Sequence, residues 1–242
     1  MRVLVISDIH ANLTALESVL YVAANYDAVW CLGDLVGYGP DPNECIARVK
    51  QLPNLTCIIG NHDLAALQQL DSDSFNPEAR TAILWTQKSL TESSKYFLDS
   101  LPEKVEMGKV TLSHGSPRHP VWEYLLDPRT ATLNFEYFET PLCFVGHTHL
   151  PVIYTLSNPD LSANLDIPEP NTTIPLPKRA ILNPGSVGQP RDRDPRAAFA
   201  IYDDQLQTWD YRRVEYDIRS VQERMIQAGL PERHIQRIAA GW

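Results

Sequence analysis

Five short polar motifs in this chain bring together the residue types that bind metal ions. Carboxylate oxygens, an amide oxygen and imidazole nitrogens suit hard and borderline divalent cations, and no cysteine takes part. Five of the seven histidines lie within these motifs, so an accidental collection of polar turns explains them poorly. The motifs are Asp8-Ile9-His10, Gly33-Asp34, Gly60-Asn61-His62-Asp63, Ser113-His114-Gly115 and Gly146-His147-Thr148-His149.

The spacing inside the motifs favours chelation. Residues at positions i and i+2 of an extended chain project to the same side, so the two ends of Asp8-Ile9-His10 can reach one ion, and those of His147-Thr148-His149 can do the same. Taken singly, each motif is also compatible with a polar turn or a helix cap. Together, with one bridging carboxylate, they provide ligands for two metals and leave positions for water and substrate. The predicted ligands are Asp8, His10, Asp34, Asn61, His114, His147 and His149.

Such a site favours an anionic phosphate ester as substrate. Two divalent ions would contribute about +4, two aspartates about −2 and a bridging hydroxide about −1, which leaves a balance of about +1. Metals roughly 3.5–4 Å apart can each take one oxygen of an in-line displacement, and they lower the pKa of a bound water toward neutrality.

His62 and Asp63 stand directly beside the expected ligand Asn61. His62 offers a proton donor, and Asp63 can orient the His62 ring and raise its basicity. These two residues are therefore the expected catalytic pair. The alternative for the motif alone is a polar turn ahead of a helix.

Each of the five motifs follows a short apolar run that is typical of a buried β-strand. Open α/β sheets place their sites at the carboxyl ends of strands, which is where the motifs fall. Segments with helical spacing separate the first runs, which indicates βαβ units and a sheet buried on both faces. Strands are expected at 2–7, 28–32, 56–59, 105–112 with a hairpin at Gly108, 142–145, 152–155, 179–182, 197–202 and 207–213; helices are expected at 14–24, 43–50, 77–101 as a pair, and 217–242 with a break near Gly229–Pro231.

Length and composition predict one ordinary globular domain over residues 1–242. Hydrophobic residues make up 43% and charged residues 21%, and a chain of this length can bury a core without disulfides. The stretch 157–177 is rich in proline and asparagine, so we expect a surface loop inserted between two strands. The four cysteines are expected to be buried thiols of a reducing compartment.

The net charge and the lengths of the apolar runs limit the classes of partner that this protein is expected to bind. The formal net charge of −9 argues against an extended nucleic acid bound along a basic face. No apolar run approaches the roughly 18 residues needed to span a membrane, and Asp8 ends the N-terminal run before it can form a signal peptide. We therefore expect a cytoplasmic protein that acts on a small phosphate ester. The sequence carries no signal of an oligomeric state.

The order of the motifs resembles that of the calcineurin-like metallophosphoesterase superfamily over almost the whole chain. Tyr38-Gly39-Pro40 and Asn183-Pro184-Gly185-Ser186-Val187-Gly188 are similar to features of its small bacterial and archaeal phosphodiesterase branch. The resemblance implies a four-layer αββα sandwich of the α/β (α+β) class, with two mixed sheets face to face and helices outside. It also implies two divalent metal ions per chain, with manganese expected and iron, cobalt, zinc and nickel as alternatives.

The resemblance also distributes the ligands and the catalytic roles. The first ion would be held by Asp8, His10, Asp34 and His149, and the second by Asp34, Asn61, His114 and His147. His62 would act as general acid on the leaving oxygen, or stabilise the transition state, while a metal-activated hydroxide attacks.

Substrate choice has to come from residues around the metal core. Arg118 and Arg191 follow two of the site loops, and an arginine there can grip a phosphate through two parallel hydrogen bonds. Tyr38 and Trp122 can stack on a base, although ordinary packing is the alternative for both. The leading function is a phosphodiesterase for small nucleotide-like substrates. A protein phosphatase or phosphomonoesterase with the same core, and a non-catalytic metal-binding scaffold, are the alternatives.

Overall fold

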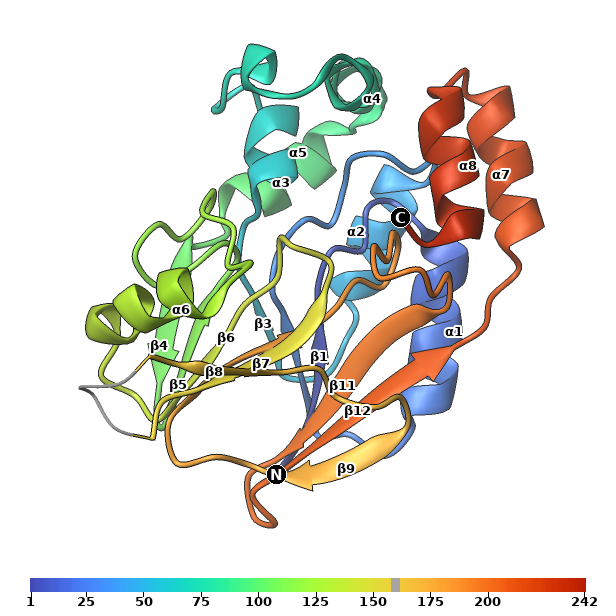
Figure 1. Ribbon diagram of the computed structural model, residues 1–242. Helices are drawn as coiled ribbons and strands as arrows, with labels where there is room; N and C mark the ends of the chain where they lie inside the picture. The colour runs from blue at the N-terminus through green and yellow to red at the C-terminus, as the bar shows by residue number, and fades with distance from the viewer. Residues whose placement is uncertain (158–161) are drawn as a thin grey trace.

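The computed structural model describes residues 1–157 and 162–242, and these residues form two six-stranded sheets packed face to face (Figure 1). The first sheet has the order β3-β2-β1-β11-β12-β9. Its β1, β2 and β3 are parallel, whereas β11, β12 and β9 join in antiparallel pairs. The strands are β1 (Arg2–Ile6), β2 (Ala28–Cys31), β3 (Leu55–Cys57), β9 (Thr172–Pro175), β11 (Ala197–Asp203) and β12 (Thr208–Val214).

The second sheet has the order β4-β5-β6-β10-β7-β8. Its central strands β5, β6 and β10 are parallel, and antiparallel pairs flank them on both sides, so this sheet is mixed as well. The strands are β4 (Lys104–Met107), β5 (Val110–Ser113), β6 (Leu142–Phe144), β7 (Pro151–Thr155), β8 (Asn164–Asp166) and β10 (Ala180–Pro184).

Alternation along the strands builds a core on each face of the first sheet. In β1, Val3 belongs to the core between the sheets, whereas its neighbour Leu4 packs toward the helices, because successive side chains point to opposite faces. Aromatic rings fill much of the space between the sheets. The ring of Phe144 from the second sheet stacks on Trp209 from the first, with centroids 5.4 Å apart.

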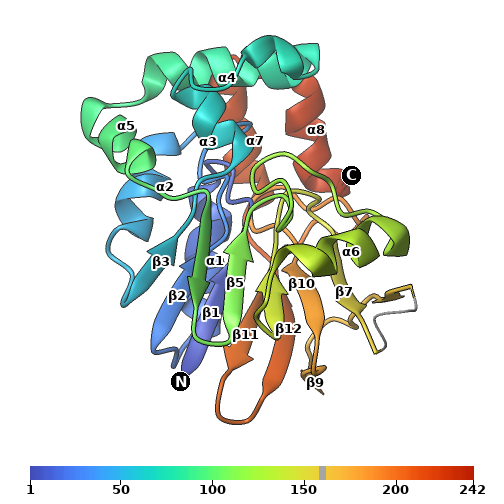
Figure 2. The same ribbon diagram turned by 90° about the vertical axis from the view of Figure 1, so that its left-hand side faces the viewer.

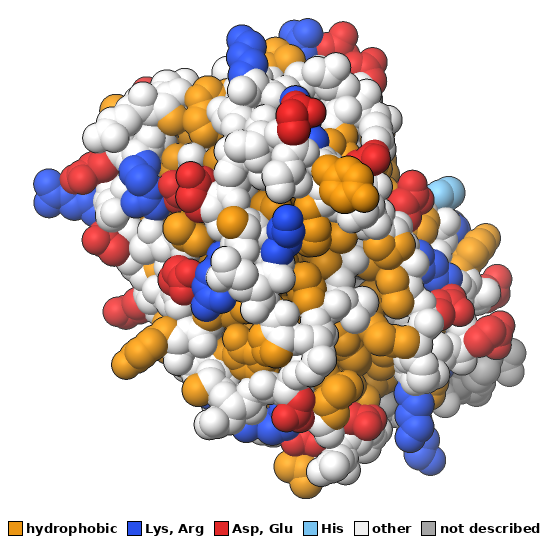
Figure 3. Space-filling model, turned by 180° about the vertical axis from the view of Figure 1, so that it is seen from behind, with side chains coloured by type: hydrophobic (Ala, Val, Ile, Leu, Met, Phe, Trp, Pro, Cys, Tyr) orange, Lys and Arg blue, Asp and Glu red, His pale blue; other side chains and the backbone are white. Residues whose placement is uncertain are grey.

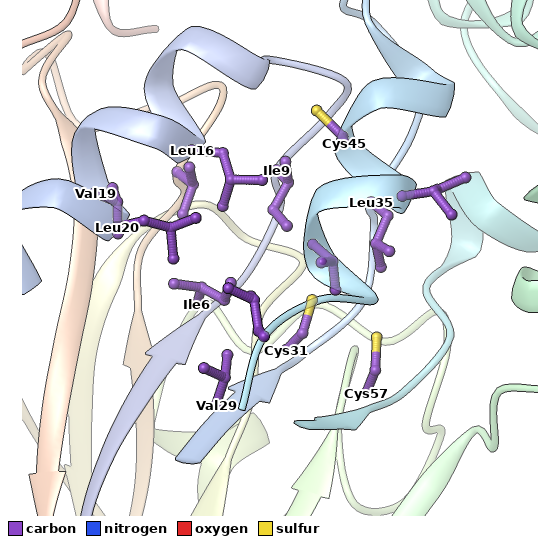
Figure 4. Packing of buried hydrophobic residues seen from close by; sticks show 14 of the residues in the cluster. Ile6, Ile9, Leu16, Val19, Leu20, Val29, Cys31, Leu35, Cys45 and Cys57 are labelled. Carbon is purple, nitrogen blue, oxygen red and sulfur yellow. The ribbon is translucent and has the colours of Figure 1, made fainter. Parts of the chain in front are cut away.

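Helices cover the outer face of each sheet and complete four layers. The helices α1 (Leu13–Ala23) and α2 (Pro42–Val49) pack on the first sheet, where Leu16 meets the side chains of β1 and β2 (Figure 4). The second sheet is covered by α6 (Pro128–Asn134) and the 3-10 helix η2 (Phe135–Tyr137). The expected αββα architecture is therefore confirmed, and all four cysteines are free and buried within it.

The remaining helices gather at one end of the sandwich, beyond the carboxyl ends of β1 and β2 (Figures 1 and 2). Side chains of α4, α7 and α8 form one apolar cluster around Tyr38. The expected helix pair at 77–101 and the break near Gly229 are both present. Every helix of the described residues is too short or too polar to cross a bilayer. These elements are α3 (Asn61–Ala66), η1 (Ser72–Ser74), α4 (Pro77–Ser89), α5 (Glu92–Asp99), α7 (Ile218–Gln227) and α8 (Glu232–Ala240).

The stretch 157–177 differs from the surface loop that the sequence suggested. Within it, β8 pairs with β7 at the edge of the second sheet, and β9 pairs with β12 at the edge of the first. The segment therefore extends both sheets, and Pro175 is tolerated in β9 because an edge strand leaves one row of backbone groups unpaired. Residues 158–161 lie outside the described residues.

Candidate metal centre

The seven predicted ligands converge in one place, although they come from both sheets. Each follows a parallel strand at its carboxyl end, β1, β2 and β3 in the first sheet and β5 and β6 in the second. All seven side chains are at most 2% exposed. The first sheet supplies Asp8, His10, Asp34 and Asn61, and the second supplies His114, His147 and His149.

One cluster joins the ligands that follow β1 to the last histidine after β6. His149 Nε2 lies 3.0 Å from His10 Nε2 and 3.3 Å from Asp8 Oδ1. His10 Nε2 lies 3.8 Å from the same Asp8 oxygen. The three donor atoms are close enough to one another to bind a single ion.

A second cluster shares Asp34 with the first. His114 Nε2 lies 3.0 Å from Asn61 Oδ1 and 3.3 Å from Asp34 Oδ2, and His147 completes the group. The same Asp34 Oδ2 lies 3.6 Å from His10 Nε2. One carboxylate oxygen therefore faces both clusters, as a bridging ligand requires.

Hydrogen bonds fix which ring nitrogen faces the centre. Because a carbonyl oxygen only accepts, His10 Nδ1 donates to Val36 at 3.0 Å and His149 Nδ1 donates to Gln189 at 2.6 Å. Each neutral ring then turns a lone pair at Nε2 toward the other, 3.0 Å away. Two lone pairs at this distance repel each other, whereas a cation in contact with both would be bound, so the pair fits a metal site.

The other two histidines are oriented in the same way. His114 Nδ1 donates to the Leu32 carbonyl at 2.8 Å, which leaves Nε2 for the centre. His147 uses Nε2 on the Trp122 carbonyl at 3.1 Å, which leaves Nδ1. A backbone partner for the second nitrogen is typical of metal-binding histidines, because it fixes both tautomer and ring orientation.

One carboxylate oxygen of Asp8 and one of Asp34 each accept a hydrogen bond from a backbone N–H group. Asp8 Oδ2 accepts from His147 N at 3.1 Å, and Asp34 Oδ1 accepts from His62 N at 2.8 Å. Within the described chain, the buried atoms Asp8 Oδ1 and Asp34 Oδ2 have no hydrogen-bond donor. A buried carboxylate oxygen without a partner is costly, so both atoms fit the role of metal ligand.

Burial and ion pairing shift the pKa values of the buried side chains in different directions. Burial raises the pKa of Asp8 to about 7 and lowers the pKa of His10 to about 3. Burial would also shift Asp34 and His114 toward their neutral forms, but their mutual attraction outweighs it. This attraction holds the pKa of Asp34 well below its usual range and raises the pKa of His114 to about 9.

The backbone of the ligand loops adopts a conformation that few residues enter. The left-handed region costs a non-glycine residue about 1–2 kcal/mol, so its repeated use here needs a local reason. Bonds between the two loops hold this geometry, since Asp8 N donates to Gly33 O at 3.1 Å and His10 N to Asp34 O at 3.0 Å. The φ angles are +53° at Asp8, +48° at His10, +53° at Asp34, +65° at His147 and +60° at His149.

His62 lies beside the first cluster with a ring that makes few polar contacts. Its centroid is 4.9 Å from the His10 ring, 4.3 Å from the Tyr38 ring and 5.0 Å from the Phe75 ring. Its buried Nδ1 has no partner within the described residues. Burial holds the pKa of His62 well below its usual range, against the attraction of Asp34. The ring is therefore neutral near pH 7 and can donate one N–H group.

The expected contact between Asp63 and His62 is not formed. Asp63 Oδ1 accepts from Val36 N at 3.1 Å, and Oδ2 accepts from Gly60 N at 3.1 Å, so both oxygens are used on the backbone. Tertiary structure brought these two N–H groups closer to the carboxylate than the adjacent ring. Asp63 thereby ties the loop that carries Asp34 to the loop that carries Asn61.

Two of the three predicted substrate-binding residues have other tasks. Arg118 is bonded to Glu123 at the side of the loop after His114, which neutralises its charge. The Tyr38 ring is only 6% exposed, so it has no free face for a base. Arg191 does lie near the centre, where its Nη2 donates to Tyr38 Oη at 3.4 Å and to Gln189 Oε1 at 3.0 Å.

An aromatic wall that spacing alone does not reveal borders the second cluster; we use this name for Phe75, Trp122 and Tyr124. The Tyr124 ring lies 3.8 Å from the His147 ring at an interplanar angle of 30°. Trp122 meets Phe75 edge to face at 5.0 Å. Trp122 and Tyr124 are 38% and 45% exposed, so their rings are open to a ligand.

Comparison with known proteins gives matches along the whole chain. The profile of the calcineurin-like phosphoesterase superfamily domain matches residues 1–205. A protein of Methanocaldococcus jannaschii named only as uncharacterised is 40% identical over an alignment of 244 positions, which covers 98% of this chain and 97% of that protein. The crystal structure of a metallophosphoesterase from Sphaerobacter thermophilus is 48% identical, with a TM-score of 0.92, and the match covers 100% of this chain and 99% of the other.

A further match is local. The symmetrical bis(5'-nucleosyl)-tetraphosphatase of Proteus mirabilis is 39% identical over 71 residues, which are 28% of this chain and 26% of that enzyme.

Replacement of Asp63 by alanine tests whether this side chain stabilises the fold by joining the two loops. The change leaves the buried Val36 and Gly60 N–H groups without an acceptor, so we expect the free energy of unfolding to fall by about 2–4 kcal/mol. Denaturant unfolding of metal-stripped protein measures this, with Asp166→Ala in the exposed strand β8 as control. Unchanged stability with lost activity would instead return Asp63 to a catalytic role.

Proposed function

The chain belongs to the calcineurin-like phosphoesterase superfamily and is a hydrolase that acts on phosphate esters, and we propose that it uses two divalent metal ions to cleave small nucleotide-like phosphodiesters. The observation that carries the two-metal proposal is the single Asp34 oxygen facing both histidine clusters without a donor of its own in the described residues. A site for one ion would need only one of these clusters.

The ligand sets follow the two clusters. Asp34 would be common to both, Asp8, His10 and His149 would complete one site, and Asn61, His114 and His147 the other. Two bound divalent ions, manganese by preference, would draw negative charge from a phosphoryl group and lower the pKa of a water molecule. The chain supplies the orientation, since every ligand histidine is locked by a backbone carbonyl.

His62 would serve the leaving oxygen. Its backbone N–H is bonded to Asp34 Oδ1 at 2.8 Å, so its position is coupled to the shared carboxylate. The neutral ring that burial favours can donate a hydrogen bond to an oxygen that gains negative charge, and to transfer a proton as general acid it would first have to take one up, which the negative charge of Asp34 favours. The close packing of Tyr38 on His62 would keep this ring in place.

The aromatic wall supports a nucleotide-like substrate. Base stacking on an exposed aromatic ring contributes about 1–3 kcal/mol per base, and Trp122 and Tyr124 stand directly beside the second cluster. The local match to a nucleosyl-tetraphosphatase agrees with this choice. The face seen in Figure 3 carries acidic and basic side chains interspersed, and the net charge is −9, so neither feature favours a long nucleic acid.

Metal removal tests the core of the proposal. We expect protein stripped with a chelator to be inactive on bis(p-nitrophenyl) phosphate and to recover when manganese is added. Asp34→Asn should reduce the bound metal from about two ions per chain to fewer than one, because both sites share this residue. Atomic emission after dialysis measures the content, with Asp204→Asn as control. Loss of a single ion would contradict the bridging role, and faster hydrolysis of p-nitrophenyl phosphate than of the diester would favour a phosphomonoesterase.

A leaving-group series tests His62. His62→Asn should slow diesters with an alkoxide leaving group by about 10²–10⁴-fold, because they need a proton in the transition state. The p-nitrophenolate leaving group is stable as an anion, so its departure should slow far less. Metal content should stay at the wild-type level. An equal loss for both leaving groups would exclude proton donation.

The wall is tested by its nucleoside preference. Trp122→Ala should reduce the kcat/KM of thymidine 5′-(p-nitrophenyl phosphate), relative to methyl p-nitrophenyl phosphate, by about tenfold, the loss of one stacked base. Tyr96→Ala, at a ring that is 80% exposed on α5, is the control. A ratio that stays at its wild-type value in Trp122→Ala would remove the wall from substrate recognition.

A further inference from the structure

Arg191 and Arg237 are half-buried cations that no carboxylate pairs with in the described parts of the chain. Arg191 bonds only to the neutral oxygens of Tyr38 and Gln189. The Arg237 side chain has no hydrogen-bond acceptor in residues 1–157 and 162–242, and the buried Nε atom of each arginine is without a partner there. Each guanidinium group thus has a buried nitrogen without an acceptor and no carboxylate partner among the described residues.

Several other arginines have acceptors for their buried nitrogens or a carboxylate partner. The half-buried Arg179 donates to the backbone carbonyls of Thr140, Phe135 and Phe138. Arg118 is paired with Glu123, Arg213 with Asp192 and Arg224 with Asp41. Acidic residues outnumber basic ones by 30 to 21, so counter-ions are not scarce. Because a buried charge without a partner costs free energy, the missing carboxylates at Arg191 and Arg237 indicate a place for an external anion.

Tyr38 brings the two arginines together. The Arg191 guanidinium lies over the Tyr38 ring at 5.7 Å, and the ring of His234 on α8 lies 4.6 Å from the same ring. Arg237 is three residues after His234, so the two side chains lie on one face of α8. Burial and the nearby Arg191 charge both lower the pKa of Arg237, which agrees with this proximity.

The pair also lies close to the metal centre. The Tyr38 ring that it flanks is 4.6 Å from the His10 ring and 4.3 Å from the His62 ring. One aromatic side chain therefore separates the arginines from the place where a phosphoryl group would be hydrolysed. An anion bound beside the arginines would therefore lie one side chain away from that phosphoryl group.

We propose that Arg191 and Arg237 form a subsite for a second phosphoryl group of the substrate, joined to the one that is hydrolysed. The proposal rests on the proposed function and narrows it, since it selects esters that carry a diphosphate or longer chain over simple diesters. Arginine suits the task because its planar fork can give two parallel hydrogen bonds to phosphate oxygens.

Binding to manganese-loaded protein tests the subsite without any turnover. We expect thymidine diphosphate to bind about tenfold more tightly than thymidine monophosphate, the worth of one charge-assisted contact. Arg237→Gln should reduce this advantage to about twofold or less, and Arg237→Lys should restore part of it. Isothermal titration calorimetry gives the dissociation constant of each protein for both nucleotides, and a thermal melt checks that each variant is folded.

Arg233→Gln is the matched control. Arg233 lies one turn earlier on α8 and over the same Trp242 ring as Arg237, but it is paired with Glu78. Its replacement should keep the diphosphate advantage at the wild-type value. Equal affinities for the two nucleotides in the wild type, or an advantage that survives in Arg237→Gln, would overturn the subsite. Absence of turnover on any phosphate ester would instead contradict the proposed function. The binding measurement does not depend on turnover, so it would still test the subsite.

Discussion

The buried carboxylate of Asp34 imposes a condition that the rest of the site has to meet. One of its oxygens is bonded to the His62 backbone, and the other faces His10 and His114 without a donor among the described residues. A charge in that position is stable only beside compensating positive charge. The inward-facing histidine nitrogens and the tight loops around Asp34 form a place for a cation that would supply this charge. Without a cation, the same arrangement would only cost free energy.

Sequence spacing predicted which residues come together at the centre, because the chemistry of a metal site limits their types and the strands fix their places. Asp8 and His10 follow one apolar run at a separation of two, and the strand that precedes them is unmistakable in composition. Their left-handed backbone was beyond reach, since nothing in the residues predicts φ angles of +53° and +48°. Those angles depend on bonds to the neighbouring loop of Asp34, a contact that only the assembled sheet creates.

The sequence predicted less well which groups each polar side chain contacts. Asp63 and Arg118 have suitable chemistry for a site, but their nearest partners in space are backbone N–H groups and Glu123, which no local pattern announces. Tyr124 follows Trp122 by two residues and could have been noticed, whereas Arg237 lies far along the chain from any motif. Short edge strands such as β8 escape prediction because three exposed residues carry almost no periodic signal.

The division of the ligands between the two sheets has a consequence for folding. The first sheet holds Asp8 and Asp34, the second holds His114 and His149, and the ring of His149 is oriented by the carbonyl of Gln189. An N-terminal piece that ends before Gln189 lacks part of this arrangement, and contacts of such large sequence separation slow folding. The ligands therefore come together only once both sheets have docked, so assembly of the site and assembly of the sandwich are a single event.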